Sequence, residues 1–143
     1  MQYPLVYSHF SPLSCVIIAI FNITLCLKRR VAGLYYTLAA DLIVGEVNNG
    51  GELVNALFTG LNQTIPFKAV RASRGKIIRA EPVAALYERQ LVHHAGVFPE
   101  LEEEMCSFSP HNCAKSPDRM DALVWALTEL SAHDHAADRF FLA

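Results

Sequence analysis

Residues 41–51 read DLIVGEVNNGG, and this stretch decides the fold that the sequence predicts. Its first part, residues 41–47, is a short run of mostly apolar residues without polar alternation. Such a run is typical of a strand that is buried on both faces of a sheet covered by helices. The two asparagines and two glycines that follow can adopt positive φ, so they predict a sharp turn where the strand ends.

Signals of helices and strands alternate on both sides of this strand. Further strands are expected at 67–72 and 91–93. Helices are expected at 31–40, 52–60, 79–89, with Pro82 in its first turn, and 99–108. A last helix, beginning at Ser116-Pro117-Asp118, carries apolar residues at helical spacing: Met120, Leu123, Val124, Leu127 and Leu130. The alternation predicts an α/β fold, a sheet flanked by helices, rather than a bundle or a sandwich.

The most apolar stretch of the chain is LSCVIIAIFNITLCL, residues 13–27. It is shorter than the roughly 18 to 20 apolar residues that a membrane-spanning helix needs, and no positive charge precedes it. A pair of buried strands rich in valine and isoleucine is the favoured interpretation. Membrane association and a poorly folding remnant are the alternatives. The segment 133–143 shows no partner in the sequence.

Composition limits the classes of function that the chain can have. With 143 residues, 52% of them hydrophobic and 18% charged, it is expected to form one folded core. A formal net charge of −2 excludes a uniformly basic nucleic-acid coat, although a local basic patch remains compatible with it. The four cysteines form no CxxC pair, which favours a reducing, cytoplasmic compartment. No GxxxxGK[ST] or GxGxxG string occurs, so neither a P-loop ATPase nor a dinucleotide fold is indicated.

Glu46 stands at the carboxyl end of the predicted central strand, directly before the turn. In open α/β sheets, ligand sites gather outside the carboxyl ends of the strands. Glu46 is therefore a candidate site residue. The alternative is an ordinary strand-end carboxylate that reaches solvent.

Asp121 is a second candidate, on the last helix. With Met120 set at zero, a step of about 100° per residue puts Asp121 at the border of the apolar stripe, near 100°, and Asp118 near 160°, facing away. The two aspartates are one turn apart and can still meet. Carboxylates from different elements are the ligands that Mg²⁺ or Mn²⁺ needs for phosphodiester cleavage.

A basic segment, residues 68–79, is the third candidate feature. It contains five of the twelve lysines and arginines and no acidic residue: Lys68, Arg71, Arg74, Lys76 and Arg79. Gly75 beside these cations allows a close approach to a nucleic-acid backbone. The segment is thus a candidate phosphate-binding surface, with a solvated basic loop as the alternative. No aromatic residues are interleaved with the cations, which argues against stacking on single strands.

Three blocks of the sequence, taken together, resemble the nuclease domain of phage DNA-packaging terminase large subunits. They are DLIVGEVNNGGELV, then VRASRGKIIRAEPVAALYERQLVHHAGVFPELEEEMCSF, then SPDRMDALVWALTEL, and the resemblance spans about residues 30–130. It implies an RNase H-like mixed sheet and cleavage of double-stranded DNA with two divalent metals, Mg²⁺ or Mn²⁺. By this resemblance Glu46 matches the acid of the central strand and Asp121 that of the closing helix, with Asp118 as a further ligand, while the basic segment lies near DNA.

Two features of the family are missing from this sequence. The resemblance implies a first acidic ligand on the opening strand, but no aspartate or glutamate precedes Asp41. The ATPase half is also absent. We therefore expect an unaligned segment at 1–29, a partial nuclease domain at 30–132, incomplete at its N-terminus, and a tail at 133–143.

This pattern is typical of a truncated or frameshifted prophage gene, whose product would cleave weakly. The partners implied are the terminase ATPase portion, the small terminase subunit and the portal. The alternative is an inactive remnant that binds DNA or a packaging partner without cleavage.

Overall fold

A computed structural model describes residues 5–8, 16–20, 25–47, 65–73, 75–94, 96–109, 117–133 and 140–142. Its strands form one sheet in the order β4-β3-β2-β1-β6-β5. Their bounds are β1 Leu5–Ser8, β2 Val16–Ile20, β3 Leu42–Glu46, β4 Phe67–Val70, β5 Val92–His94 and β6 Phe140–Leu142. The sheet is mixed, because β2, β3 and β4 run parallel while β1 is antiparallel to both β2 and β6.

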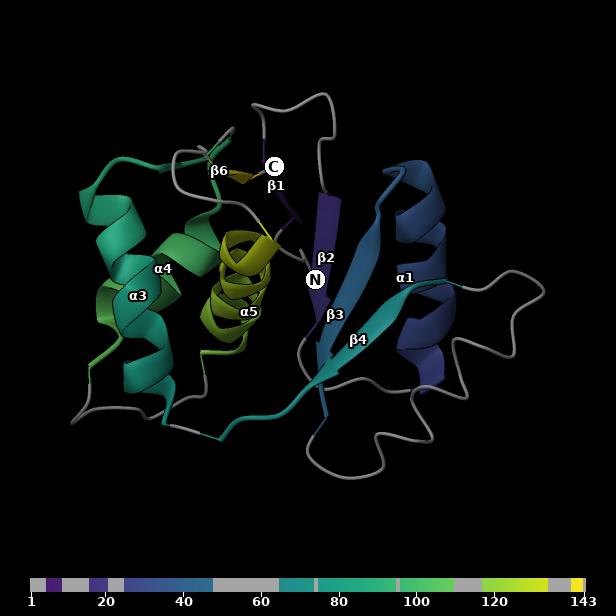
Figure 1. Ribbon diagram of the computed structural model, residues 1–143, viewed down its shortest axis with the longest axis horizontal. Coiled ribbons are helices and arrows are strands. Elements are labelled where there is room, and N and C mark those ends of the chain that lie inside the picture. Colours follow the sequence, from purple (N-terminus) through teal and green to yellow (C-terminus); the bar gives the residue numbers. More distant parts are fainter. Residues whose placement is uncertain are drawn as a thin grey trace.

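Helices cover both faces of this sheet (Figure 1). The described helices are α1 Leu25–Thr37, α3 Lys76–Glu88, α4 Pro99–Ser107 and α5 Asp118–His133. Helix α1 lies on one face, and α3, α4 and α5 lie on the other, with α5 against the sheet. The α/β class expected from the sequence, a mixed sheet flanked by helices, is confirmed.

Strand β3, expected to be central, is the second strand from one edge of the sheet, and it contributes to the core on both of its faces. Ile43 packs in a cluster with Val31 of α1, and the next residue, Val44, packs in a second cluster with Leu123 and Leu127 of α5. Both strand residues are almost completely buried. Because successive side chains of a strand point to opposite faces, this is the burial expected of a strand without polar alternation.

Several predicted boundaries are wrong. Residues 13–27 are not a strand pair, because β2 ends at Ile20 and α1 begins at Leu25. Helix α3 begins at Lys76 rather than at residue 79, which places Pro82 inside the helix instead of in its first turn. Helix α1 likewise begins before its predicted start at residue 31. The residues that the two helices gain, 25–30 and 76–78, are largely leucine, lysine, arginine or isoleucine, which a helix accommodates at little cost. The predicted helix 52–60 lies outside the described residues.

The C-terminal segment has partners that the sequence did not indicate. Strand β6 pairs antiparallel with β1 and parallel with β5, so it joins the two halves of the sheet. A three-residue strand carries no periodic pattern, and its place depends on strands far away in the sequence. None of the helices in the described ranges is long and apolar enough to cross a bilayer.

Candidate functional site

Glu46 is the last residue of β3, at the carboxyl end of the parallel strands. It lies opposite Val70 of β4, and the backbone N–H of Val47 donates to the Val70 carbonyl at 2.9 Å. The residue is only 7% exposed. Glu46 is therefore held in the interior and is not a strand-end carboxylate in solvent.

Asp121 lies in the first turn of α5 and is 1% exposed. Its position is fixed by a cap that comes from another helix. Glu104 of α4 accepts hydrogen bonds from the backbone N–H groups of Arg119, at 2.9 Å, and Met120, at 3.1 Å. These bonds satisfy N–H groups that a helix start leaves without partners. The local cap expected at Ser116 lies outside the described residues.

The guanidinium of Arg79, from α3, joins the two acids. Its Nη1 lies 3.5 Å from Glu46 Oε2, and its Nη2 lies 3.3 Å from Asp121 Oδ1. One planar group thus spans both carboxylates, which is the geometry that arginine favours. Glu46 and Asp121, which sequence reasoning proposed separately, converge at this point. We call Glu46 and Asp121 the acidic pair.

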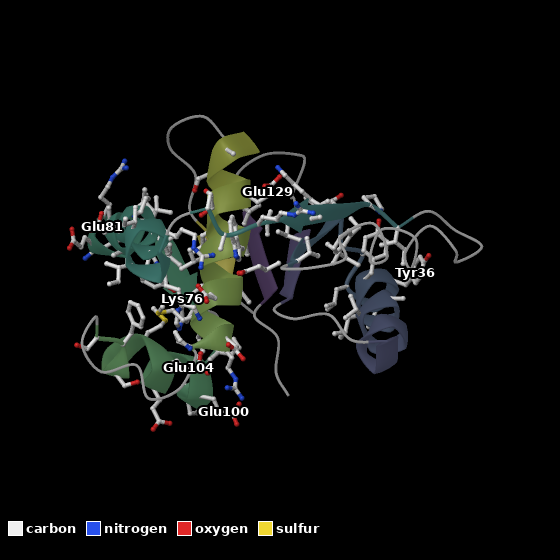
Figure 2. The ribbon with its side chains drawn as sticks, turned by 90° about the horizontal axis from the view of Figure 1, so that it is seen from below. Tyr36, Lys76, Glu81, Glu100, Glu104 and Glu129 are labelled. Carbon is white, nitrogen blue, oxygen red and sulfur yellow. The ribbon has the colours of Figure 1, made fainter. Side chains whose placement is uncertain are left out.

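Two further side chains complete the surroundings of the acidic pair. Lys76 Nζ lies 2.5 Å from Asp121 Oδ2, and Figure 2 shows Lys76 between α3 and α5. Trp125, one turn after Asp121, donates its indole N–H to Glu46 Oε2 at 2.9 Å. The Arg79 guanidinium carbon lies 4.8 Å from the centre of the Trp125 ring, a cation–π distance. Trp125 was missed from the sequence, although its spacing of four residues from Asp121 was available.

The formal charges around the acidic pair cancel, since two carboxylates meet one guanidinium and one ammonium. The two cations are held near the carboxylates by charge attraction more than by well-aligned hydrogen bonds. Neither oxygen of Asp121, nor Nε of Arg79, has a hydrogen-bond partner of good geometry within the described part of the chain. Buried charges depend on such partners, so losing either cation would leave a carboxylate uncompensated.

A second ion pair of the same kind lies farther along α5. Lys68 of β4 places its Nζ 2.6 Å from Glu129 Oε1, and the Glu129 side chain is 8% exposed. Glu129 follows Asp121 by about two turns, and Figure 2 shows it at a different level of α5 from Lys76. Glu129 was not singled out from the sequence, where it reads as an ordinary helix carboxylate.

The five cations of the basic segment have different environments. Three of them, Lys68, Lys76 and Arg79, hold buried carboxylates. Arg71 is exposed, and Arg74 lies outside the described residues. Their contact with DNA stays a prediction.

The described residues bring together two carboxylates, Glu46 and Asp121, and their role as metal ligands stays a prediction. Asp118 is exposed at the start of α5, and its role as a ligand stays a prediction. In the described ranges, no group of three or more His, Cys, Asp or Glu residues is placed to hold a metal ion. The acidic pair has the oxygen donors of a single divalent cation but does not fit two metals without further ligands.

Three side chains, one each from α3, β5 and α4, are linked in a row by hydrogen bonds. Tyr87 Oη lies 2.8 Å from His94 Nε2, and His94 Nδ1 lies 3.2 Å from Glu102 Oε1. Burial, followed by the charge of Glu102, raises the pKa of Tyr87 to about 12. The N–H of Phe98 and the His94 ring lower the pKa of Glu102. These hydrogen bonds connect α3, β5 and α4.

A pocket of about 360 Å³ opens between α3 and α5, beside the acidic pair. Arg79 and Trp125 line it together with the apolar side chains of Val83, Leu86 and Val124. The same two residues that hold Glu46 thus also form a wall of the pocket.

A mixed sheet between helices, with one acid at the end of β3 and another on the packed helix α5, defines an α/β protein. The family model of the terminase RNaseH-like domain matches residues 24–130, and the chain belongs to this family. No curated protein and no solved structure matches it.

Proposed function

We propose that the chain is the nuclease domain of a DNA-packaging terminase large subunit, which binds double-stranded DNA and cleaves it with Mg²⁺ or Mn²⁺ at a strongly reduced rate. The observation that carries the proposal is the convergence of Glu46 and Asp121 on Arg79. Two acids from a strand end and a helix, buried side by side in this family's fold, are the donor set of a hard divalent cation.

In this proposal Glu46 and Asp121 hold the cation, which would supply Lewis-acid stabilisation of the charge that develops on the phosphodiester. Trp125 orients the Glu46 carboxylate through its N–H. Glu104 orients Asp121 indirectly, because it caps the turn on which Asp121 lies. Arg79 and Lys76 have to move from the acidic pair before a cation can take their place.

The reduced rate follows from the ligand count. Strand β3 has two parallel neighbours, β2, which reads VIIAI, and β4, which reads FKAV, and neither contains a carboxylate. A first acid on an opening strand beside β3, as the resemblance implies, has no counterpart in either. Without it a second metal lacks an anchor, so the two-metal arrangement is incomplete.

The test is incubation of purified protein with supercoiled plasmid in Mn²⁺ or Mg²⁺. Slow nicking that Glu46→Ala and Asp121→Ala abolish is the expected result. Cleavage that persists in both variants would remove the acidic pair from the mechanism. Glu81→Ala, an exposed carboxylate on α3, is the matched control and should nick like the wild type.

A second candidate function is DNA binding without cleavage. It is favoured by the charge balance of the acidic pair, which needs no metal for neutrality. Salt-sensitive binding without any divalent-dependent turnover would select this candidate. In either case we propose the ATPase portion of a terminase, the small subunit and the portal as protein partners.

The proposed origin from a split or truncated prophage gene has its own test. An ATPase reading frame that ends shortly upstream in the genome would support it. A chain encoded with no terminase genes nearby would contradict it.

A further inference from the structure

We propose that buried carboxylates hold the cations of the basic segment away from DNA phosphate, so that Asp121 and Glu129 limit the affinity of this chain for double-stranded DNA. The inference rests on the proposed function, because it concerns how the same segment binds DNA. It assigns Asp121 and Glu129 a role that is separate from metal binding.

The two ends of each ion pair differ in exposure. The side chains of Lys68 and Lys76 are 49% and 31% exposed, whereas those of Glu129 and Asp121 are 8% and 1% exposed. The lysine side chains therefore reach the surface, where a phosphate can approach them, and the carboxylates do not. Phosphate and carboxylate compete for the same ammonium.

The competition lowers the affinity for DNA because a lysine that binds phosphate leaves its buried carboxylate without that partner. If Lys76 turns toward a phosphate, the one ion pair left to Asp121 among the described residues is that with Arg79 at 3.3 Å, and Arg79 is shared with Glu46. A buried carboxylate that loses a partner is strongly destabilised. The free energy lost at the carboxylate reduces the free energy gained when the lysine binds DNA. A neutral amide of the same shape removes this cost and weakens the attraction that holds the cation at the carboxylate.

The experiment measures binding of a double-stranded oligonucleotide by fluorescence anisotropy in EDTA, over a series of salt concentrations. Each phosphate newly neutralised steepens the slope of log K against log salt by about 0.9. Asp121→Asn should release Lys76, and Glu129→Gln should release Lys68. Each variant is expected to bind about five- to tenfold more tightly at low salt and to show the steeper slope.

Glu81→Gln is the matched control. It removes the same charge from the same helix as Lys76 and Arg79, but Glu81 is exposed and lies on the side of α3 away from α5 (Figure 2). It should raise the affinity less than twofold and leave the slope unchanged. This control separates release of a bound cation from the general effect of a lower negative charge.

Equal slopes for Asp121→Asn, Glu129→Gln and Glu81→Gln would overturn the inference while leaving DNA binding intact. No binding by wild type or any variant would overturn both the inference and the DNA-binding part of the proposed function. The binding experiment is done in EDTA, where no cleavage occurs. A variant that fails to cleave DNA therefore contradicts the proposed nuclease activity but leaves the measured slopes, and this inference, unchanged. Because Glu129 lies apart from the acidic pair, Glu129→Gln tests the proposal even if Asp121→Asn fails to fold.

Discussion

Lys76 and Asp121 form an ion pair of 2.5 Å in which the carboxylate is 1% exposed and the lysine side chain 31% exposed. The lysine can exchange this contact for water, but the aspartate cannot. The pair is therefore asymmetric: Asp121 depends on its cations far more than they depend on it. This asymmetry determines how the two residues respond to substitution.

Asp121→Ala should lower the free energy of unfolding by about 3 kcal/mol, in the range found when one partner of a buried pair is removed. Arg79, whose side chain is 11% exposed, would be left with Glu46 alone. Urea unfolding measures the effect as a lower midpoint at an unchanged slope. Asp118→Ala, an exposed aspartate in the same turn, should lose less than about 1 kcal/mol. Equal losses of unfolding free energy in the two variants would show that the buried ion pair stabilises the protein no more than an exposed aspartate does.

Lys76→Met should tighten the binding of Mn²⁺ to the acidic pair, because it removes a cation that competes for Asp121. An about tenfold lower Kd, or about 1.4 kcal/mol, is expected. Trp125 is the only tryptophan of the chain and contacts Glu46, so its emission reports the titration directly.

The control for this titration is Lys68→Met, which removes the same charge from the Glu129 pair instead. It should leave the Kd for Mn²⁺ within about twofold of wild type, a change of about 0.4 kcal/mol. If both lysine variants tighten binding equally, the effect is long-range charge and not competition at Asp121. If neither responds to Mn²⁺, the acidic pair holds no divalent cation.

Tyr87 should make the stability of the protein fall at alkaline pH. Its pKa is raised to about 12 in the folded protein, from 10.0, so the folded state favours the neutral phenol. The stability that this contributes is complete below about pH 10 and is lost as the pH rises through about 12. Tyr87→Phe should therefore flatten the decline of the unfolding midpoint across this interval. At neutral pH it should cost about 1 kcal/mol, for the lost hydrogen bond to His94.

Tyr36→Phe, on the exposed side of α1, is the control for the alkaline titration. It should leave both the midpoint at neutral pH and the alkaline decline as in wild type. A decline that stays equally steep in Tyr87→Phe would assign the alkaline sensitivity to another group.

Local patterns in the sequence were sufficient for the centre of the fold. The apolar run around Ile43 and Val44 predicted a strand buried on both faces, and the two residues do pack in different clusters. Helical arithmetic placed Asp121 at the edge of the core stripe, and the residue is buried there. In each case the signal lies within one element, where periodicity is readable.

The contacts that make the site were not readable in the same way. Arg79 was assigned to the basic segment alone, and its contacts with Glu46 and Asp121, which follow from the packing of α3 on α5, were not predicted. Glu129 pairs with Lys68, which lies 61 residues earlier in the sequence. Such pairings depend on which helices become neighbours, and no spacing in a single sequence specifies this. The strand β6 was missed for the same reason.

The cap of α5 by Glu104 offers a last test, because it connects α4 to the position of Asp121. Glu104→Ala removes acceptors for the N–H groups of Arg119 and Met120 and for the Arg119 guanidinium, at 2.8 Å. A loss of about 2 kcal/mol in unfolding free energy is expected, as for a strong N-cap with charge-assisted bonds. Amide hydrogen exchange should quicken at Arg119 and Met120 and remain slow at Leu127. Glu103→Ala, an exposed neighbour in α4, should change neither quantity. Unchanged exchange in Glu104→Ala would mean that the turn carrying Asp121 is held by its packing and not by this cap.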